Sequence, residues 1–384
     1  MGSRNLGDLV TGFPERFPRT WALMKSGVSD RIAPGFVVGV WQDPKNLKDP
    51  EFEYSVGAFG HRRLIPSEQP MTEETIFDLA SVSKVLGTST LAALLVARGW
   101  LNWNVRVKDV FPDYRNQEIR IRHLLSHTAG FEAWLPLWQK IEARFSPRPL
   151  YTVPVLARQQ AMRQEVFAVD PEVTPGTRTL YSDVSFLLLG FVLEEISNLP
   201  LNQAIERWVW KPMGLKQTRY FPVTASAVQA RLDEVAATEQ DQWRNSVMQG
   251  QVHDENCWAM GGYGGHAGAF GTARDILIFT SRLMNGFLPA SVLHDCWTRC
   301  ESPAHCERTL GWDTPTGRNP SSGHLFSAST VGHLGFSGTS LWIDPRARLG
   351  VTLLSNRIHP TRDNLTIRAF RPKLHDAVRE DLSR

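Results

Sequence analysis

The strand-forming runs of this chain lie near its two ends, and a long helical segment separates them. Residues 36–42 and 52–59 are rich in valine, phenylalanine and tyrosine, and they flank a Pro/Asp/Lys turn that predicts a β-hairpin. Residues 338–343 and 349–355 bracket the turn Asp344-Pro345 and predict a second antiparallel pair. The simplest assembly of these four runs is one antiparallel sheet built from both ends of the chain. The sequence therefore predicts an α+β fold with a mostly helical insert.

Helical patterns predict the other elements. A helix over residues 17–31 ends at Ala33-Pro34-Gly35, and a closing helix is predicted over 363–382; both are expected to cover the sheet. The helices predicted between them span 75–98, 119–125, 135–145, 153–166, 182–196, 201–210 and 272–284. The chain is expected to form two domains. Residues 1–125 and 266–384 form a discontinuous sheet domain, and residues 126–265 form a mostly helical insert.

Composition excludes several classes of function. With 384 residues, 42% hydrophobic and 21% charged, the chain is an ordinary globular protein of one large domain or two intimate ones. A net charge of +3 is too small to predict a nucleic-acid partner. No stretch approaches the roughly 20 apolar residues of a membrane span. Residues 1–5 lack the apolar core of a secretory signal, so the sequence as it stands indicates the cytoplasm, and the periplasm only if a signal was removed.

The cysteines do not predict a disulfide framework or a zinc ribbon. Three of them lie near His294 and His305, but the paired Cys-x-x-Cys spacing of zinc sites is missing, so buried free thiols are the preferred interpretation. The four are Cys257, Cys296, Cys300 and Cys306. No metal is predicted, and the oligomeric state stays open.

A serine and a lysine lie three residues apart where an apolar helical run begins. This spacing places Ser81 and Lys84 on one face of a helix, one turn apart. A serine hydroxyl is a weak nucleophile at neutral pH, and a lysine whose ammonium form is disfavoured by burial can serve as its base. The spacing alone also arises by chance, so acyl transfer needs further parts.

Two other clusters supply those parts. Tyr181-Ser182-Asp183 opens a helical run, and a tyrosine there can shuttle a proton if a nearby ammonium lowers its pKa. His333-Leu334-Gly335-Phe336 leads into a predicted strand, where the glycine admits a substrate backbone and the Phe336 amide could join the Ser81 amide in an oxyanion hole. The structural alternatives are an aromatic residue at the start of a helix and a turn histidine.

In this order, the three motifs resemble those of the serine β-lactamase and penicillin-binding protein superfamily, in its class C β-lactamase, esterase and DD-peptidase-like branch. The resemblance covers nearly the whole chain, because residues 121–130, 211–215 and 265–275 also look like segments of that family. Residues 252–256 and 356–360 look most like the branch that includes DD-carboxypeptidases. The resemblance implies a β-lactamase/transpeptidase-like fold with the active site between the two domains.

The resemblance also implies a role for each motif residue. Ser81 would attack the acyl carbon, and Lys84 and Tyr181 would move its proton to the leaving group and then activate water. The amides of Ser81 and Phe336 would form the oxyanion hole, and no metal or organic cofactor is needed. The residues expected to contact substrate are Asp183, His333, Leu334 and Gly335.

Two positions depart from the family pattern. Asp183 replaces an asparagine, and an ionised carboxylate near Lys84 would favour the ammonium form, shift the base role towards Tyr181 and repel acidic substrates. His333 and Leu334 replace a lysine and a hydroxyl residue that hold a substrate carboxylate, and histidine is only partly charged near neutral pH. If His333 binds an anionic group, affinity for acidic substrates should weaken as the pH rises through its pKa.

The sequence therefore predicts a serine acyl-hydrolase that works through an acyl-enzyme on Ser81. Its partner would be a small-molecule or peptide substrate: a β-lactam, a D-alanyl peptide or a small ester. DD-carboxypeptidase-like or esterase activity is favoured over efficient β-lactamase activity. The alternative is a catalytically weak or inactive β-lactamase-fold protein that serves as a binding or assembly module, which the altered Asp183 and His333 motivate.

Overall fold

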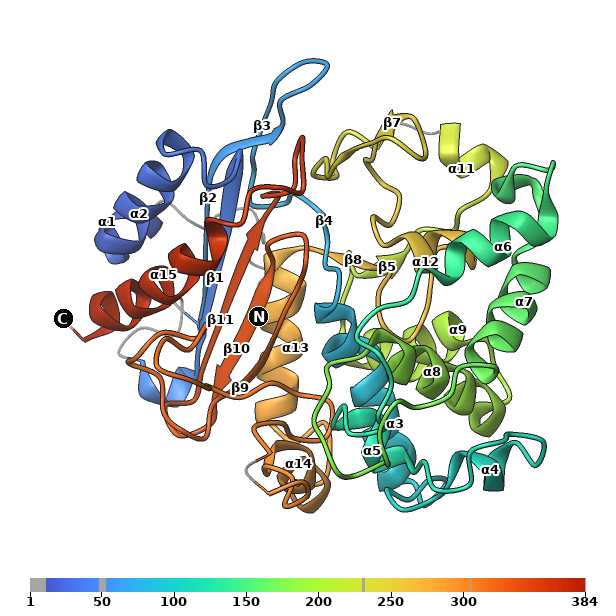
Figure 1. The fold of residues 1–384 in the computed structure, drawn as a ribbon. Helices are drawn as coiled ribbons and strands as arrows, with labels where there is room; N and C mark the ends of the chain where they lie inside the picture. The colour runs from blue at the N-terminus through green and yellow to red at the C-terminus, as the bar shows by residue number, and fades with distance from the viewer. Residues whose placement is uncertain (1–11, 48–52, 230–231, 305, 384) are drawn as a thin grey trace, which may run out of the picture.

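A six-stranded antiparallel sheet forms one half of the molecule (Figure 1). The computed structural model describes residues 12–47, 53–229, 232–304 and 306–383. The strand order is β3-β2-β1-β11-β10-β9, so strands from the two ends of the chain meet at the centre of the sheet, as the sequence predicted. The strands are β1 (Gly35–Gln42), β2 (Tyr54–Arg63), β3 (Gln69–Pro70), β9 (Val331–Leu334), β10 (Ser340–Asp344) and β11 (Leu349–Ser355).

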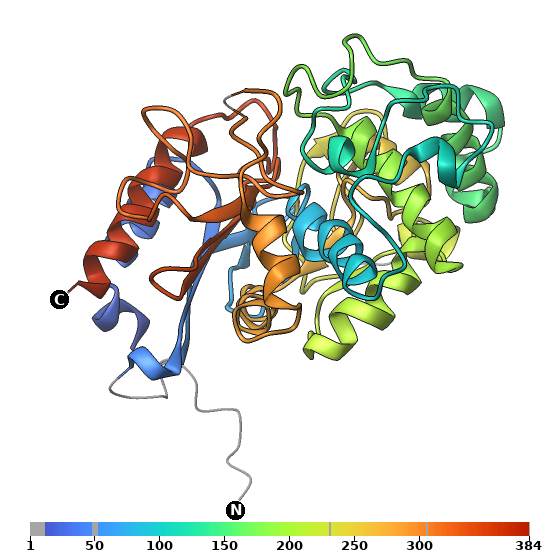
Figure 2. The same cartoon turned by 90° about the horizontal axis from the view of Figure 1, so that it is seen from below.

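Both faces of the sheet are covered by helices, which is why β1 is apolar along nearly its whole length. Val37 and Trp41 point to one face, which α13 (Ala273–Met284) covers. Phe36 points to the other, which α2 (Pro18–Ser29) and α15 (Ile367–Leu382) cover (Figure 2). Successive side chains of a strand alternate between faces, so a strand buried on both faces needs apolar residues at every position.

The other half of the molecule is mostly helical. Its central helix, α8 (Asp183–Ser197), is apolar and buried around most of its circumference. The remaining helices from the N-terminal part of this half are η3 (Lys84–Ser89), α3 (Thr90–Ala97), α4 (Val107–Val110), α5 (Ile121–Leu125), α6 (Leu137–Phe145) and α7 (Val155–Phe167). Those that follow α8 are α9 (Leu201–Ile205), η5 (Glu206–Trp210), α10 (Lys211–Met213), α11 (Ala225–Gln229) and α12 (Glu255–Ala259).

The predicted domain boundary at residue 125 stays a prediction. The segments η3, α4 and α5 all lie on the N-terminal side of that boundary, and all pack against α8. A short sheet of β4 (Phe77–Asp78), β8 (Ala269–Gly271) and β5 (Arg219–Tyr220) lies beside them. The short elements that complete the described structure are α1 (Phe13–Arg16), η1 (Pro44–Asn46), η4 (Leu150–Thr152), β6 (Gln240–Asp241), β7 (Ser246–Val247) and α14 (Ala290–Trp297).

One predicted helix begins later than expected. The prediction was residues 75–98, but Phe77 and Asp78 pair with β8, and helical structure starts only at Val82. The pairing with β8 is a long-range interaction that local periodicity does not report. Ser81 consequently lies at the N-terminal end of the helix rather than within it.

The structure also bears on the cysteines, on metal binding and on membrane-spanning helices. The four cysteines are free thiols, and Cys257, Cys296 and Cys306 are buried. Within the described ranges, no three His, Cys, Asp or Glu side chains are grouped so that they could hold a metal ion. In the same ranges no single helix is long and apolar enough to cross a membrane, although the bent pair Asp183–Ser197 and Leu201–Met213 together reaches that length and composition.

A close backbone contact holds the segment before β8 against α8, and it yields a stability prediction. A Cβ at Gly265 would overlap the carbonyl oxygen of Phe186 in α8. Because both atoms belong to the backbone, neither can move cheaply, and Gly265→Ala should destabilise the protein by about 3 kcal/mol. The midpoint and slope of urea unfolding would measure this.

The control for this prediction is Gly99→Ala. Gly99 has open space around it, and its φ of +70° alone should cost about 1 kcal/mol in the variant. Equal free energies of unfolding for the two variants would contradict the proposed contact.

Candidate active site

A sharp turn presents Ser81 at the start of its helix. Ala80 has φ +46°, a left-handed conformation that costs a non-glycine residue roughly 1–2 kcal/mol. The buried carboxylate of Asp78 accepts hydrogen bonds from the amides of Ala80 (2.8 Å) and His253 (2.7 Å). These bonds hold the turn and tie it to the segment before α12.

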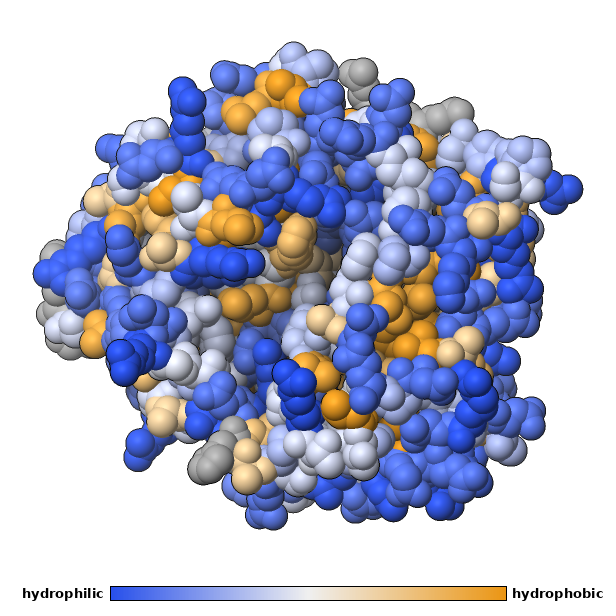
Figure 3. Space-filling view, in the orientation of Figure 1, coloured by the Kyte–Doolittle hydropathy of each residue, from blue (hydrophilic) through white to orange (hydrophobic). Residues whose placement is uncertain are grey.

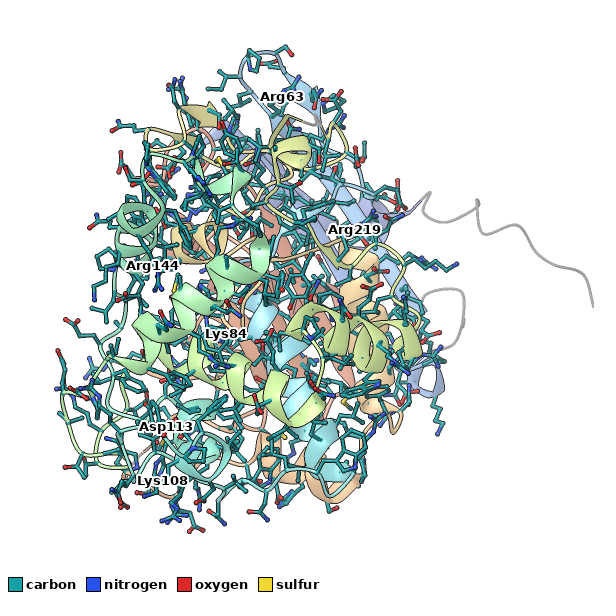
Figure 4. The ribbon with its side chains drawn as sticks, turned by 90° about the vertical axis from the view of Figure 1, so that its right-hand side faces the viewer. Arg63, Lys84, Lys108, Asp113, Arg144 and Arg219 are labelled. Carbon is teal, nitrogen blue, oxygen red and sulfur yellow. The ribbon has the colours of Figure 1, made fainter. Side chains whose placement is uncertain are left out.

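Lys84 is fully buried and lies beside Ser81. Its Nζ donates to Ser81 Oγ (2.9 Å), Asp183 Oδ1 (2.7 Å) and the carbonyl oxygen of His266 (2.9 Å). An ammonium group has three N–H donors, and each is used here. In Figure 4 Lys84 lies in the middle of the view, whereas Arg63 and Lys108 lie near its edges.

The charge of Lys84 is controlled by Asp183. Burial alone would lower the pKa of the Lys84 ammonium, but the carboxylate of Asp183, assisted by Tyr181, raises that pKa above its usual range. Lys84 is therefore an ammonium at neutral pH in the free protein. This agrees with the expectation that Asp183 favours the charged form.

Tyr181 lies against the same ammonium. Lys84 Nζ is 5.1 Å from the centroid of the Tyr181 ring, and the guanidinium of Arg308 is 5.2 Å from it. Burial raises the pKa of Tyr181, and the charge of Lys84 opposes this without cancelling it. The phenol consequently keeps its proton at neutral pH.

His127 positions Tyr181, a role that the sequence did not indicate. Its ring centroid lies 4.4 Å from that of Tyr181, its Nδ1 accepts from the amide of Ser182 (3.1 Å), and its carbonyl oxygen accepts from the amide of Leu180 (2.8 Å). Its φ of +56° shows that the local backbone is strained to make these contacts. The signal that could have found it is its place in the family-like segment 121–130.

The turn that carries Phe336 is held by arginines from the C-terminal part of the chain. Arg357 donates to the Phe336 carbonyl oxygen (2.6 and 3.0 Å), and Arg371 donates to that of Gly335 (2.9 Å). In the described part of the chain, the amides of Ser81 and Phe336 donate no hydrogen bond. Two free donors near one nucleophile are what an oxyanion hole requires.

His333 brings no positive charge to the site. It is only 2% exposed, and its Nδ1 bonds the carbonyl oxygen of Leu334 (2.8 Å), so that nitrogen carries the proton. Burial, with the nearby charges of Lys84 and Arg308, lowers the pKa of His333 well below its usual range. The neutral ring leaves Nε2 as a buried acceptor without a partner among the described residues. An acceptor of this kind cannot donate to a substrate carboxylate.

Two cavities meet at Ser81. In the orientation of Figure 1, hydrophobic residues reach the surface around the hollow near the middle of the molecule (Figure 3). One cavity has a volume of 530 Å³ and includes His333, Leu334 and Gly335 in its wall; the other has a volume of 340 Å³. The residues common to both walls are Ser81, Tyr181, Asp183 and Phe336. The structure thus brings all the motif residues of the sequence analysis to one place.

Comparison with known proteins gives the family of this chain. A family model described as Beta-lactamase matches residues 21–373. A protein named "Putative D-alanyl-D-alanine carboxypeptidase" from Salmonella agona (strain SL483) is 31% identical over 317 residues, covering 75% of this chain and 71% of the relative. A protein of the same name from Salmonella typhi is 30% identical over the same shares.

Solved structures show the same fold. "EstCE1, a hydrolase with promiscuous acyltransferase activity" superposes with a TM-score of 0.72 at 20% identity, covering 94% of this chain and 98% of its own. A class C β-lactamase from Rhodobacter sphaeroides superposes with a TM-score of 0.65 at 20% identity, covering 95% of this chain and 99% of its own. With the matching family model and the curated relatives, these likenesses lead to one conclusion: the chain has a β-lactamase/transpeptidase-like fold and belongs to the β-lactamase family of serine hydrolases.

Proposed function

We propose that this protein is a serine acyl-hydrolase that forms an acyl-enzyme on Ser81. The observation that carries the proposal is the 2.9 Å contact between Lys84 Nζ and a Ser81 hydroxyl that lines two cavities. A nucleophile within hydrogen-bond reach of its base, beside free oxyanion donors, is the arrangement that acyl transfer requires. The binding-module alternative would be favoured by a Ser81 closed off from solvent or a distant Lys84, and neither condition holds.

Because Lys84 rests as an ammonium, the base must first be generated. The Lys84 ammonium loses one proton to solvent, and the Asp183 carboxylate, 2.7 Å from Nζ, sets how much free amine exists at a given pH. Free amine is therefore a minor form at neutral pH, and below the Lys84 pKa it increases about tenfold with each unit of rise in pH. The Lys84 amine then takes the Ser81 proton as Oγ attacks the acyl carbon.

Tyr181 completes the proton route in this proposal. Its phenol, which is protonated at neutral pH, donates to the leaving group as the acyl–leaving-group bond breaks, and it recovers a proton from Lys84. In the second step the same groups take a proton from a water molecule as it attacks the acyl-enzyme. They return a proton to Ser81 Oγ as the ester bond to Ser81 breaks and the carboxylic acid product leaves. The amides of Ser81 and Phe336 stabilise the oxyanion in both steps, and one such donor is worth about 10²–10³ in rate.

The altered third motif bears on the substrate. The neutral His333 and the apolar Leu334 replace the charge and hydroxyl that hold the carboxylate of a β-lactam or peptide in the family, so we propose a small ester, or a D-alanyl peptide whose carboxylate is held elsewhere, in preference to a β-lactam. The names of the curated relatives favour carboxypeptidase activity, and that of the hydrolase EstCE1 favours an acyl ester.

Labelling of Ser81 tests the nucleophile. Intact-protein mass spectrometry after exposure to penicillins, D-alanyl thioesters and 4-nitrophenyl esters should show one acyl adduct, because deacylation is slow for at least one of these acyl groups. Ser81→Ala should abolish the adduct. Ser321→Ala should retain it, since Ser321 lies in the wall of the larger cavity and its hydroxyl bonds no lysine or histidine side chain among the described residues.

An unlabelled wild-type protein with no ester turnover at any pH would overturn the enzymatic proposal and support a binding or assembly module. Labelling that survives Ser81→Ala would show that another residue is the nucleophile.

The pH dependence of Asp183→Asn tests the proton route. Removing the carboxylate leaves burial as the dominant influence, which lowers the pKa of Lys84, so free amine exists at lower pH. We therefore expect the ascending limb of kcat/KM against pH to move to lower pH in Asp183→Asn. Each unit of displacement corresponds to a factor of about ten in free amine below the pKa.

The matched control is Asp313→Asn, which removes a carboxylate of the same cavity that pairs with Arg308 (3.0 Å) instead of Lys84. Its ascending limb should stay near that of the wild type. An Asp183→Asn profile that is unchanged, or displaced to higher pH, would contradict control of Lys84 by Asp183.

A further inference from the structure

Two of the four cysteines, Cys300 and Cys306, lie beside one another in the segment that leads to Arg308. The amide of Cys300 donates to the carbonyl oxygen of Arg308 (2.9 Å), and Sγ of Cys306 lies 3.7 Å from the same oxygen. The chain turns back between the two cysteines, where the Cys306 amide donates to the carbonyl oxygen of Pro303 (3.0 Å). As a result the two thiols are hydrogen-bond partners of each other, although both are free.

The contact between the thiols makes them unequal. The hydrogen bond from Cys300 lowers the pKa of the Cys306 thiol against the effect of burial, and Thr179 Oγ1 (3.5 Å) and the backbone and charge of Arg308 act in the same direction. The same thiol contact, with burial, raises the pKa of Cys300. A thiolate is the reactive form of cysteine, and reactive thiolates of redox sensors often lie next to a second, resolving thiol. Cys306 and Cys300 fit these two roles.

The other two cysteines lack these features. Burial raises the pKa of Cys296 to about 12, and burial with the charge of Asp254 raises that of Cys257 well above its usual range. Sγ of Cys257 donates instead to the carbonyl oxygen of Ala267 (3.4 Å). Buried cysteines that keep their proton are inert, so oxidation is expected at one pair of thiols only.

The pair is connected to the candidate active site through Tyr181. Thr179, whose hydroxyl contacts Cys306, lies just before Tyr181 in the chain. Arg308, whose backbone contacts both cysteines, has its guanidinium 5.2 Å from the centroid of the Tyr181 ring and lies in the wall of the larger cavity. A change in the charge of Cys306 therefore acts on two neighbours of Tyr181.

We propose that Cys300 and Cys306 are a redox modification site, at which a peroxide forms a disulfide that a dithiol reduces again. The Cys306 thiolate attacks one oxygen of hydrogen peroxide, the O–O bond breaks, and the departing hydroxide takes up a proton, which leaves a sulfenic acid on Cys306. The sulfur of Cys300 then attacks that of Cys306 and loses its proton, while the S–O bond breaks and water departs. Two thiols thus lose two electrons, and one peroxide molecule becomes two waters.

The consequence for activity rests on the proposed function. A disulfide is neutral, so it loses the attraction that a Cys306 thiolate has for the Thr179 hydroxyl and for Arg308. With these contacts weakened, Tyr181 is held less firmly. We expect kcat for 4-nitrophenyl acetate to fall by about tenfold on oxidation, which is less than the roughly 10²-fold cost of a 1 Å misplacement. Dithiothreitol should restore it.

Thiol counting in the wild-type protein tests the site. Reduced protein is exposed to hydrogen peroxide at a concentration that oxidises free cysteine, then denatured and alkylated with iodoacetamide. Four alkyl groups are expected before oxidation and two after it, since the chain has four cysteines. Peptide mapping should link Cys300 to Cys306, and dithiothreitol should return the count to four.

Serine variants assign the two roles. In Cys300→Ser, dimedone should trap a sulfenic acid on Cys306, because no resolving thiol is present. In Cys306→Ser, Cys300 should react at least about tenfold more slowly, because its pKa is raised. Cys296→Ser is the matched control and should form the disulfide as the wild type does. Cys306→Ser should also keep its own kcat after peroxide treatment, which controls for oxidation of methionine.

The outcomes separate this inference from the hydrolase. Four alkylated cysteines after peroxide, or a disulfide that includes Cys257 or Cys296, would overturn the site, and equal trapping in Cys300→Ser and Cys306→Ser would overturn the role of Cys306. A Cys300–Cys306 disulfide with an unchanged kcat would overturn the connection to Tyr181. A protein that forms this disulfide but turns over no ester, reduced or oxidised, would support the site and count against the proposed function.

Discussion

The structure depends on one buried ion pair, between Lys84 and Asp183. A fully buried ammonium is tolerable only if its charge is balanced and its protons are bonded, because breaking such a pair costs about 3–5 kcal/mol. The three acceptors of Lys84 come from three segments: the turn before η3, the start of α8 and the loop before β8. Satisfying one side chain therefore requires the helical half and the β8 segment to meet at this point.

A second set of contacts holds the groups around that pair. Asp78 fixes the left-handed turn before Ser81, His127 supports Tyr181, and Arg357 and Arg371 hold the turn of Phe336. These residues need not touch substrate to matter. They set the positions of the nucleophile, the proton carrier and the oxyanion donors before a substrate arrives, which is how a site lowers the cost of charge development.

Much of the fold could be predicted from local sequence. The strands at the two ends follow from alternating and β-branched runs beside turns. Thr272 is the N-cap of α13, and its hydroxyl accepts from the Asp275 amide, as the helix start signal predicts. The late start of the Ser81 helix could not be predicted in this way. It depends on pairing of Phe77 and Asp78 with residues 270–271, which are distant in sequence.

The site was predictable in its motifs but not in its electrostatics. The effect of Asp183 on Lys84 follows from residue type, whereas the neutrality of His333 follows from a burial that no motif reports. The arginines in the wall of the larger cavity were missed for a related reason. Arg357, Arg368 and Arg371 belong to no catalytic motif. The packing of α15 beside β9 and β10 brings Arg368 and Arg371 to the cavity, and the segment after β11 brings Arg357.

The charge of Lys84 in the free protein is the most direct test of this account. It can be followed by the ¹⁵N resonance of its Nζ in lysine-labelled protein, assigned by comparison with Lys84→Arg and titrated from about pH 6 to about pH 11 around the usual lysine pKa of about 10.4. If Asp183 controls the site, the resonance stays at its ammonium position through neutral pH and moves only above the usual pKa. A midpoint near about pH 8 or below, as burial alone would give, would contradict the account.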